Sequence, residues 1–170
     1  MNSFLDKKEL QNLGFKSIGE NVMISRKASI YGARNIEIGN NVRIDDFCIL
    51  SGKITLKNNI HIAAYSALYG GDVGIDIEDF ANISSRVCIY AISDDYSGVS
   101  MTNPTIPDKY KNLEKAPVTI GNHVIVGTGS TILPGADLKI GTAVGAMSSE
   151  QDDKTKVSQL TSMSLSVISF

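Results

Sequence analysis

The sequence lacks the features that mark several large classes of protein. Its 170 residues carry a formal net charge of only −2, and the lysines and arginines do not cluster. That charge balance gives no reason to expect nucleic acid as a partner. No run approaches the roughly 18 apolar residues of a membrane-spanning helix, and the N-terminal residues form a charged helical pattern instead of a signal-peptide core. We therefore expect one cytoplasmic domain that does not insert into a membrane.

Cysteine and histidine are also scarce, with two of each. Cys48 and Cys88 are too few for a disulfide framework, and their spacing is not that of a metal site. We expect both to be reduced thiols that point into the core. The sequence gives no reason to expect a bound metal.

A six-residue period is the strongest signal in the chain. Between Ile120 and Ser149 an aliphatic residue returns at every sixth position, and the same rule holds through most of the chain before it. The residue four positions after each of these anchors is small or aliphatic nearly throughout. The anchors are Ile18, Ile24, Ile30, Ile38, Ile44, Leu50, Leu56, Ile62, Leu68, Ile77, Ile83, Ile89, Ile120, Val126, Ile132, Leu138 and Val144.

This period predicts an all-β solenoid. Three six-residue faces make one coil, and each strand pairs with the strand one coil away at about 4.8 Å, as in a parallel sheet. An α-helix would place successive anchors on different sides, and the Gly, Asn and Pro content would break it. Short insertions follow Ile30 and Leu68, and residues 90–119 interrupt the coil at length. The predicted parts are a helical cap at 1–15, a β-helix at 16–149 with a loop at 90–119, and a divergent tail at 150–170 that could be disordered.

The N-terminal helix is predicted over residues 3–14. Ser3 would cap it with Asp6 three positions on, and Leu10 and Leu13 would share its apolar face. Gly14 would end it. Such a helix could cover one end of the solenoid, because each coil buries its inner face only against a neighbour.

The hexads resemble those of a known family, the hexapeptide-repeat acyltransferases. Within it the chain is most similar to sugar O-acetyltransferases of the maltose and galactoside type and of surface-polysaccharide clusters. The segments that carry this resemblance are His61 to Tyr65, Leu68 to Gly71, Ser93 to Gly98 and Met101 to Pro104, together with the final coils. The resemblance implies a left-handed parallel β-helix, a homotrimer, and acetyl-CoA in a groove between adjacent subunits. A γ-type carbonic anhydrase would need three zinc-binding histidines, and only His61 and His123 are present.

Acetyl transfer to a hydroxyl needs a base to take the hydroxyl proton. The relatives place a histidine shortly after the last anchor before the long loop, where this chain has Asp94. Asp94 or Asp95 could act as the base or orient the acceptor, with a pKa raised by burial or by the neighbouring charge. His61 is the other candidate base, whereas His123 lies in a turn and is expected to be a plain surface residue. A third possibility is an amine acceptor, which Asp94 and Asp95 would bind.

The binding residues are expected on the coils and on the long loop. Candidate acceptor contacts are Tyr65, Tyr69, Asn82 and Tyr96. Gly127 and Gly145 lie one 18-residue coil apart, so small residues should stack into a column along which the pantetheine arm of CoA could run. The candidate CoA contacts are Gly127, Thr128, Ser130, Gly145 and Ala146.

The leading hypothesis is therefore an acetyl-CoA-dependent O-acetyltransferase. Its acceptor would be a sugar or sugar nucleotide of surface-polysaccharide biosynthesis, and the acceptor hydroxyl would attack the thioester directly. The alternatives are an aminosugar N-acetyltransferase on the same scaffold and a non-catalytic hexapeptide-repeat homologue. The missing loop histidine favours the non-catalytic reading, as does the departure from the family pattern after Ser149.

Overall fold

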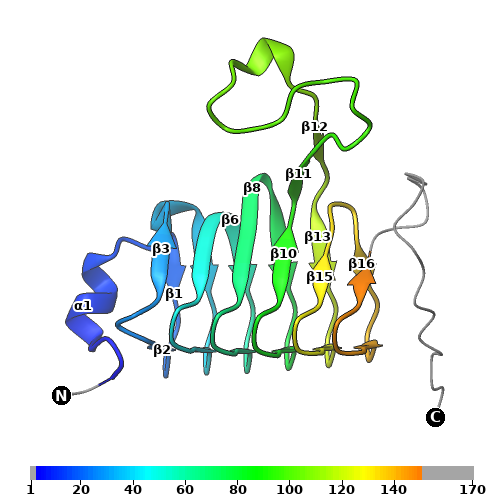
Figure 1. Cartoon of the computed structure of the whole chain (residues 1–170). Coiled ribbons are helices and arrows are strands. Elements are labelled where there is room, and N and C mark those ends of the chain that lie inside the picture. Colours follow the sequence, from blue (N-terminus) through cyan, green and yellow to red (C-terminus); the bar gives the residue numbers. More distant parts are fainter. Residues whose placement is uncertain (1–2, 151–170) are drawn as a thin grey trace.

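The computed structural model describes residues 3–150, and these form a solenoid of parallel strands (Figure 1). Successive coils stack from the N-terminal end to the C-terminal end, and the sequence colours run evenly along the stack. Most residues belong to short strands separated by tight turns. The predicted all-β solenoid is confirmed. Residues 1–2 and 151–170 lie outside the described part, so the predicted tail does too, except that Glu150 still pairs with Ile132.

The strands form two main sheets. A six-stranded sheet makes one face of the coil, and a ten-stranded sheet bends around a corner to make the other two. The six-stranded sheet contains β2 (Met23–Ile24), β5 (Arg43–Ile44), β7 (His61–Ile62), β9 (Asn82–Ile83), β14 (Ile125–Val126) and β17 (Ala143–Val144). The ten-stranded sheet contains β1 (Ser17–Ile18), β3 (Ser29–Tyr31), β4 (Ile36–Ile38), β6 (Ile49–Leu56), β8 (Ala67–Ile77), β10 (Cys88–Tyr90), β13 (Val118–Ile120), β15 (Thr131–Ile132), β16 (Asp137–Leu138) and β18 (Ser149–Glu150).

The predicted anchors fill the interior. From Ile38 onward every anchor is buried, and Ile44, Ile62 and Val126 are among those with no exposed surface. Anchors pair across coils in register; Ile62, for example, lies against Ile83. At the N-terminal end Ile18 and Ile30 are only partly buried. The close packing of branched aliphatic side chains explains why the sixfold rule is so strict.

The corners of the coil use left-handed backbone. At the corner after the six-stranded sheet, Phe47, Tyr65, Arg86 and Met147 have φ values between 60° and 64°. Non-glycine residues rarely adopt this conformation, and it is strained for bulky ones. The stacked coils hold it by backbone hydrogen bonds, such as Tyr65 N to Asp46 O at 3.0 Å.

The N-terminal helix is shorter than the sequence predicts. α1 spans Lys7–Asn12, and its cap is Asp6, whose carboxylate accepts from the Glu9 backbone N–H in a capping box. The predicted cap at Ser3 is therefore wrong, because Phe4 is already extended and bridges Ser25. Leu10 joins the core as expected, whereas Leu13 is exposed. The helix lies at the N-terminal end of the stack (Figure 1).

The two cysteines differ in orientation. Cys48 is fully buried at an inward position, as predicted. Cys88 is only partly buried, because it directly precedes the anchor Ile89 and neighbouring side chains of a strand point to opposite faces. The expectation that both thiols point inward is wrong for Cys88, which lies on the outer face between Ala67 and Thr131 of the flanking coils.

The two short insertions are absorbed at one corner. After Ile30 the extra residues form the 3₁₀ turn η1 (Ala33–Asn35). The extra residues at Gly70 to Asp72 become part of the long strand β8, which shifts register against β6 near Gly52. This is the corner around which the ten-stranded sheet bends.

The long interruption rises from the same corner. β11 (Ile92–Asp94) and β12 (Leu113–Lys115) form an antiparallel pair that projects from the solenoid, and the 3₁₀ turn η2 (Asp108–Tyr110) lies in the loop that they carry. We call residues 92–115 the excursion (Figure 1). Its base is closed by a hydrogen bond from Ala116 N to Ala91 O of 3.1 Å.

Two contacts fix the excursion to the coil beneath it. A Cβ at Gly71 would lie 2.1 Å from Ile92 Cδ1, so the excursion begins packed directly on a glycine with a φ of 53°. Lys115 also pairs with Asp72 at 3.1 Å. The base of the excursion therefore has a defined place on the scaffold.

Shortening an anchor should destabilise the whole stack. We expect Ile83→Ala to lower the free energy of unfolding by about 2–5 kcal/mol, because it leaves a cavity in a fully buried site. Ile125→Ala is the matched control: Ile125 lies on the next strand of the same sheet but points outward and is 51% exposed, so its cost should be about 0.5 kcal/mol or less. Denaturant unfolding at equal protein concentration would compare the two. Equal losses would contradict this view of the interior.

Candidate functional site

The sequence-predicted site residues fall into two groups on opposite sides of the solenoid. His61, Asn82 and the glycine column belong to the six-stranded sheet, whereas Asp94, Asp95 and Tyr96 belong to the excursion. In a three-sided coil the corner that carries the excursion lies opposite the six-stranded face. In Figure 1 the excursion rises at one edge and the label of β2 marks the other. One chain alone therefore does not bring the two groups together.

His61 is held by two neighbours on the outer face of the six-stranded sheet. Its Nε2 lies 2.8 Å from Asp45 Oδ2, and its Nδ1 lies 3.1 Å from Asn82 Oδ1. Arg43 donates to the other Asp45 oxygen at 2.7 Å. Burial raises the pKa of Asp45, but the hydrogen bonds from His61 and Arg43 outweigh it, so the net pKa lies below the usual value. Both ring nitrogens of His61 are thus engaged within the chain, which argues against a free lone pair for general-base catalysis.

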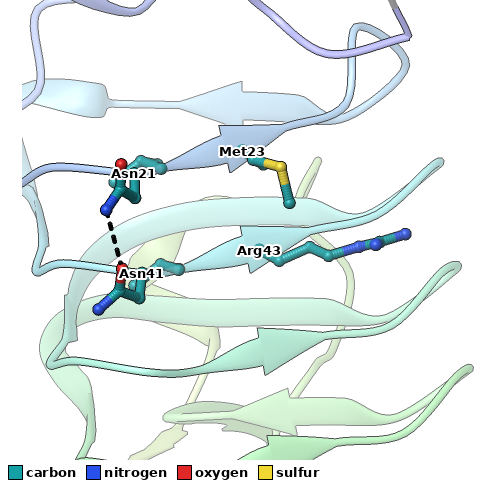
Figure 2. Close-up of a pocket in the computed structure, with 6 residues that line it drawn as sticks. Asn21, Met23, Asn41 and Arg43 are labelled. Atoms are coloured by element: carbon teal, nitrogen blue, oxygen red, sulfur yellow. Dashed lines mark hydrogen bonds between the residues drawn. The ribbon is translucent and has the colours of Figure 1, made fainter.

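This polar cluster continues toward the C-terminal coils. Alternate residues of a strand face the same side, so Asn82 and Ser84 both face outward. Because Asn82 pairs with Ile125 of the next coil, Gly127 lies beside Ser84 on the same outer surface. In the other direction the face adjoins an open hollow of 480 Å³ lined by Asn21, Val22, Met23, Asn41, Val42 and Arg43. Figure 2 shows the Arg43 and Met23 side chains on one side of this hollow and the hydrogen-bonded Asn21–Asn41 pair on the other.

The predicted glycine column exists. Gly127 stacks on Gly145 so closely that a Cβ at Gly127 would lie 2.5 Å from the Ala146 nitrogen. Gly145, Ala146 and Thr128 are exposed. Small, exposed residues of this kind leave room for an extended ligand chain to approach the backbone.

Ser130 does not share this exposure. It has no accessible surface, and its Oγ donates to Gly145 O at 2.8 Å. Ser130 Oγ also accepts from Ser148 N at 3.3 Å. The expectation that Ser130 contacts CoA is not supported, because its hydroxyl points inward and supports the turn. Position four after an anchor is an interior position, and Ser130 follows that rule.

Asp94 lies at the end of β11, opposite Leu113 of β12. Its side chain is half-buried. Among residues 3–150 no hydrogen bond or ion pair engages its carboxylate, although Ser93 Oγ donates to its backbone oxygen. Asp94 therefore presents a carboxylate whose acceptor capacity is unused within the described chain.

Asp95 has the opposite environment. Its Oδ1 accepts from Ser97 N at 2.8 Å, and its Oδ2 accepts from Ser100 Oγ at 2.9 Å and Asn112 Nδ2 at 3.5 Å. These bonds, with those from Ser97 the largest effect, lower the pKa of Asp95 to about 2. The expectation of a raised pKa is wrong for Asp95, and so weak a base is unsuited to proton abstraction.

The candidate tyrosines are divided between the two groups. Tyr69 stacks on Tyr90 with ring centroids 5.1 Å apart, on the outer face directly beneath the excursion. Tyr96 lies on the excursion itself and is highly exposed. Tyr65 is at the corner beside the six-stranded sheet, where it stacks on Phe47 at 4.9 Å. Burial raises the pKa of Tyr90, so it stays protonated near neutral pH.

Some site features were missed at the level of sequence. Arg43 and Asp45 were not singled out, although each is the neighbour of His61 one coil away, and an 18-residue offset from His61 points to Arg43. Tyr90 could have been found by the same stacking from Tyr69. His123 is an exposed corner residue, as expected, and it stacks on Phe80.

Within residues 3–150 no group of three or more His, Cys, Asp or Glu side chains is arranged to hold a metal ion. The same residues include no helix that is long and apolar enough to cross a membrane.

Comparison with known proteins gives the class. No family model matches the chain. The chain is 51% identical over 154 residues to the dTDP-4-amino-4,6-dideoxy-D-glucose acyltransferase of Escherichia coli. This match covers 89% of this chain and 80% of the relative. The chain is 30% identical to the putative lipopolysaccharide biosynthesis O-acetyl transferase WbbJ of Escherichia coli K12, over 74% of this chain and 63% of the relative.

A solved structure points to the same class of protein. AntD, an N-acyltransferase from Bacillus cereus, superposes with a TM-score of 0.86 at 57% identity, covering 88% of this chain and 80% of that one. That structure is a variant at Ser84 of AntD, in complex with dTDP-4-amino-4,6-dideoxyglucose and coenzyme A. Other AntD structures are variants at its Asp94, with dTDP and coenzyme A, or contain dTDP and 3-hydroxybutyryl-CoA.

The chain therefore belongs to the hexapeptide-repeat acyltransferases that act on sugars, and it is an enzyme of that family. The left-handed parallel β-helix that the resemblance implied is confirmed. The coenzyme A thioester expected as the acyl donor agrees with the ligands of AntD.

Proposed function

We propose that this protein transfers an acyl group from a coenzyme A thioester to the 4-amino group of a nucleotide-linked amino sugar. The observation that carries this proposal is the identity of more than half over nearly the whole chain with acyltransferases of dTDP-4-amino-4,6-dideoxyglucose. These relatives favour the amine acceptor, which sequence analysis placed second, over the hydroxyl acceptor that it placed first. An amino-sugar nucleotide also fits a place in surface-polysaccharide biosynthesis.

The chemistry of the excursion supports an amine. A hydroxyl requires a base strong enough to take its proton during attack, and the resemblance to sugar O-acetyltransferases implies a histidine for this. Here the position is held by Asp94, a carboxylate with unused acceptor capacity. A carboxylate attracts an ammonium group and orients it, and it can take the proton that the nitrogen must lose before its lone pair attacks. This chain also has a serine and an aspartate at the two numbers, 84 and 94, that were altered in AntD.

The reaction then balances as follows. Asp94 takes one proton from the ammonium group, and the neutral nitrogen forms a bond to the thioester carbonyl carbon. The carbon–sulfur bond breaks, and the second proton that the nitrogen loses passes to the sulfur, which leaves as the free thiol of coenzyme A. Acyl-CoA would supply the activated acyl group along Gly127, Thr128, Gly145 and Ala146.

We also propose that the site is shared between chains of a homotrimer. Within one chain the excursion and the six-stranded face lie on opposite sides, so a second copy is needed to bring Asp94 close to Asn82 and Ser84. Tyr69 and Tyr96 would then contact the acceptor from one subunit, and Tyr65 from the other. The face offers apolar surface for such contact, because Ile125 is 51% exposed and Met147 79% exposed.

The acceptor assay tests the proposed reaction. We expect release of free CoA thiol and an acylated product with dTDP-4-amino-4,6-dideoxyglucose, using acetyl-CoA or 3-hydroxybutyryl-CoA. We expect no product with dTDP-6-deoxyglucose, which has a hydroxyl in place of the amine. Asp94→Asn should lower kcat by about 10²-fold or more, whereas His61→Gln should cost less because both His61 nitrogens are already engaged. Turnover of the hydroxyl analogue alone would favour O-acylation, and turnover of neither would favour a non-catalytic homologue.

The acyl-CoA groove has its own test. Ala146→Glu adds bulk and negative charge to an exposed position of the glycine column, so we expect the KM for acyl-CoA to rise by about tenfold with little change in the melting temperature. The control is Ile140→Glu, which adds the same charge at another exposed corner of the last coils. A KM for acyl-CoA unchanged by Ala146→Glu would exclude this column as the donor site.

Mixing of inactive chains tests the shared site. Asp94→Asn removes the carboxylate of the excursion, and Asn82→Arg blocks the six-stranded face. If each site combines the excursion of one subunit with the face of another, mixed trimers contain some intact sites and regain activity. A mixture of Asp94→Asn with Asp94→Ala should not. Light scattering should give the mass of three chains, and a monomer with full activity would overturn the proposal.

A further inference from the structure

The two adjacent carboxylates of the excursion have different surroundings, and within residues 3–150 only that of Asp94 is unengaged. Asp94 ends the antiparallel ladder, and Asp95 begins the irregular loop. Asp95 receives three hydrogen bonds, so both oxygens of its carboxylate are engaged inside the excursion. Chemistry at the acceptor therefore falls to Asp94, and the function of Asp95 has to be sought in what it binds.

The partners of Asp95 come from both limbs of the excursion. Ser97 and Ser100 lie on the limb that leaves the coil, and Asn112 lies on the limb that returns, one residue before the Leu113 that pairs with Asp94. The Asp95 carboxylate thus ties the limbs together just beyond the last pair of the β11–β12 ladder. A second tie follows further out, where Met101 N donates to Tyr110 O at 2.9 Å.

The location of the Asp95 tie determines which part of the excursion depends on it. The base of the excursion is held without Asp95, by Gly71 against Ile92 and by the Asp72–Lys115 pair. Within residues 3–150 the strand Ile92–Asp94 forms its ladder with β12 alone, so the end of β11 depends on the returning limb. Loss of the Asp95 tie would leave Asp94 at the frayed end of a three-residue pair, and small displacements of a catalytic group are costly.

We propose that Asp95 is a positioning residue, which joins the two limbs of the excursion and so holds the Asp94 carboxylate at the acceptor. This inference rests on the proposed function, since it assumes that Asp94 faces the amino sugar. The proposal also predicts different effects on the two substrates. Within one chain the Asp95 tie does not contact the six-stranded face that carries the acyl-CoA column, so we expect Asp95 to act on the acceptor half of the reaction.

Steady-state kinetics with both substrates test the proposal. We expect Asp95→Ala to lower kcat/KM for the amino-sugar nucleotide by about tenfold or more, while the KM for acyl-CoA stays within about twofold. Asp95→Asn should lie between, because its side-chain oxygen can still accept from Ser97 N as the Asn103 side chain does from Thr105 N in the same loop. The control is Asp108→Asn, which removes another excursion carboxylate that pairs only with Lys111 at the surface.

Hydrogen exchange separates failure of this inference from failure of the proposed function. Amides of residues 96–112 should exchange faster in Asp95→Ala than in the wild type or Asp108→Asn, with no change in the coils or in the melting temperature. Wild-type protein that does not acylate the amino sugar would refute the proposed function, while the exchange result would still decide whether Asp95 orders the excursion. Unchanged exchange, unchanged kcat/KM in Asp95→Ala, or equal losses for both substrates would each overturn the positioning role.

Discussion

The close packing of aliphatic side chains between stacked coils is the constraint on which the structure depends. Each coil is too small to bury its own inner face, so its stability comes from neighbours held in register by parallel backbone hydrogen bonds. An anchor position holds a branched aliphatic residue throughout, as Ile62 against Ile83 illustrates. The outer positions have no such restriction. Stability and chemistry are therefore carried by different residues of the same short strands.

That division explains what could be read from the sequence. The interior repeats every six residues, so the scaffold, its strands and the buried state of Cys48 follow from counting. Cys88 was misplaced because its position relative to Ile89, and not its residue type, decides which way it points. The start of α1 was also misplaced, because Asp6 and Glu9 form a better capping box than the one assigned to Ser3.

The site was harder to predict because its geometry is not periodic. Counting coils would have found Arg43 from His61 and Tyr90 from Tyr69, since both are register neighbours. No counting rule distinguishes Asp94 from Asp95, which are adjacent and chemically identical. Their difference arises from the return limb, where Asn112 meets one of them and not the other. The separation of the excursion from the His61 face likewise depends on which corner carries the insertion.

The hydrogen bond between Ala116 and Ala91 has a wider consequence. It brings the two ends of the excursion together, and the flanking strands β10 and β13 both pair with β8 as though the coil were continuous. Lengthening a loop whose ends are already joined costs little, because the entropy of closure grows only logarithmically with length. The excursion is in this sense a module that the fold tolerates at almost any size. New acceptors could be acquired by exchanging that module while the scaffold beneath it stays the same.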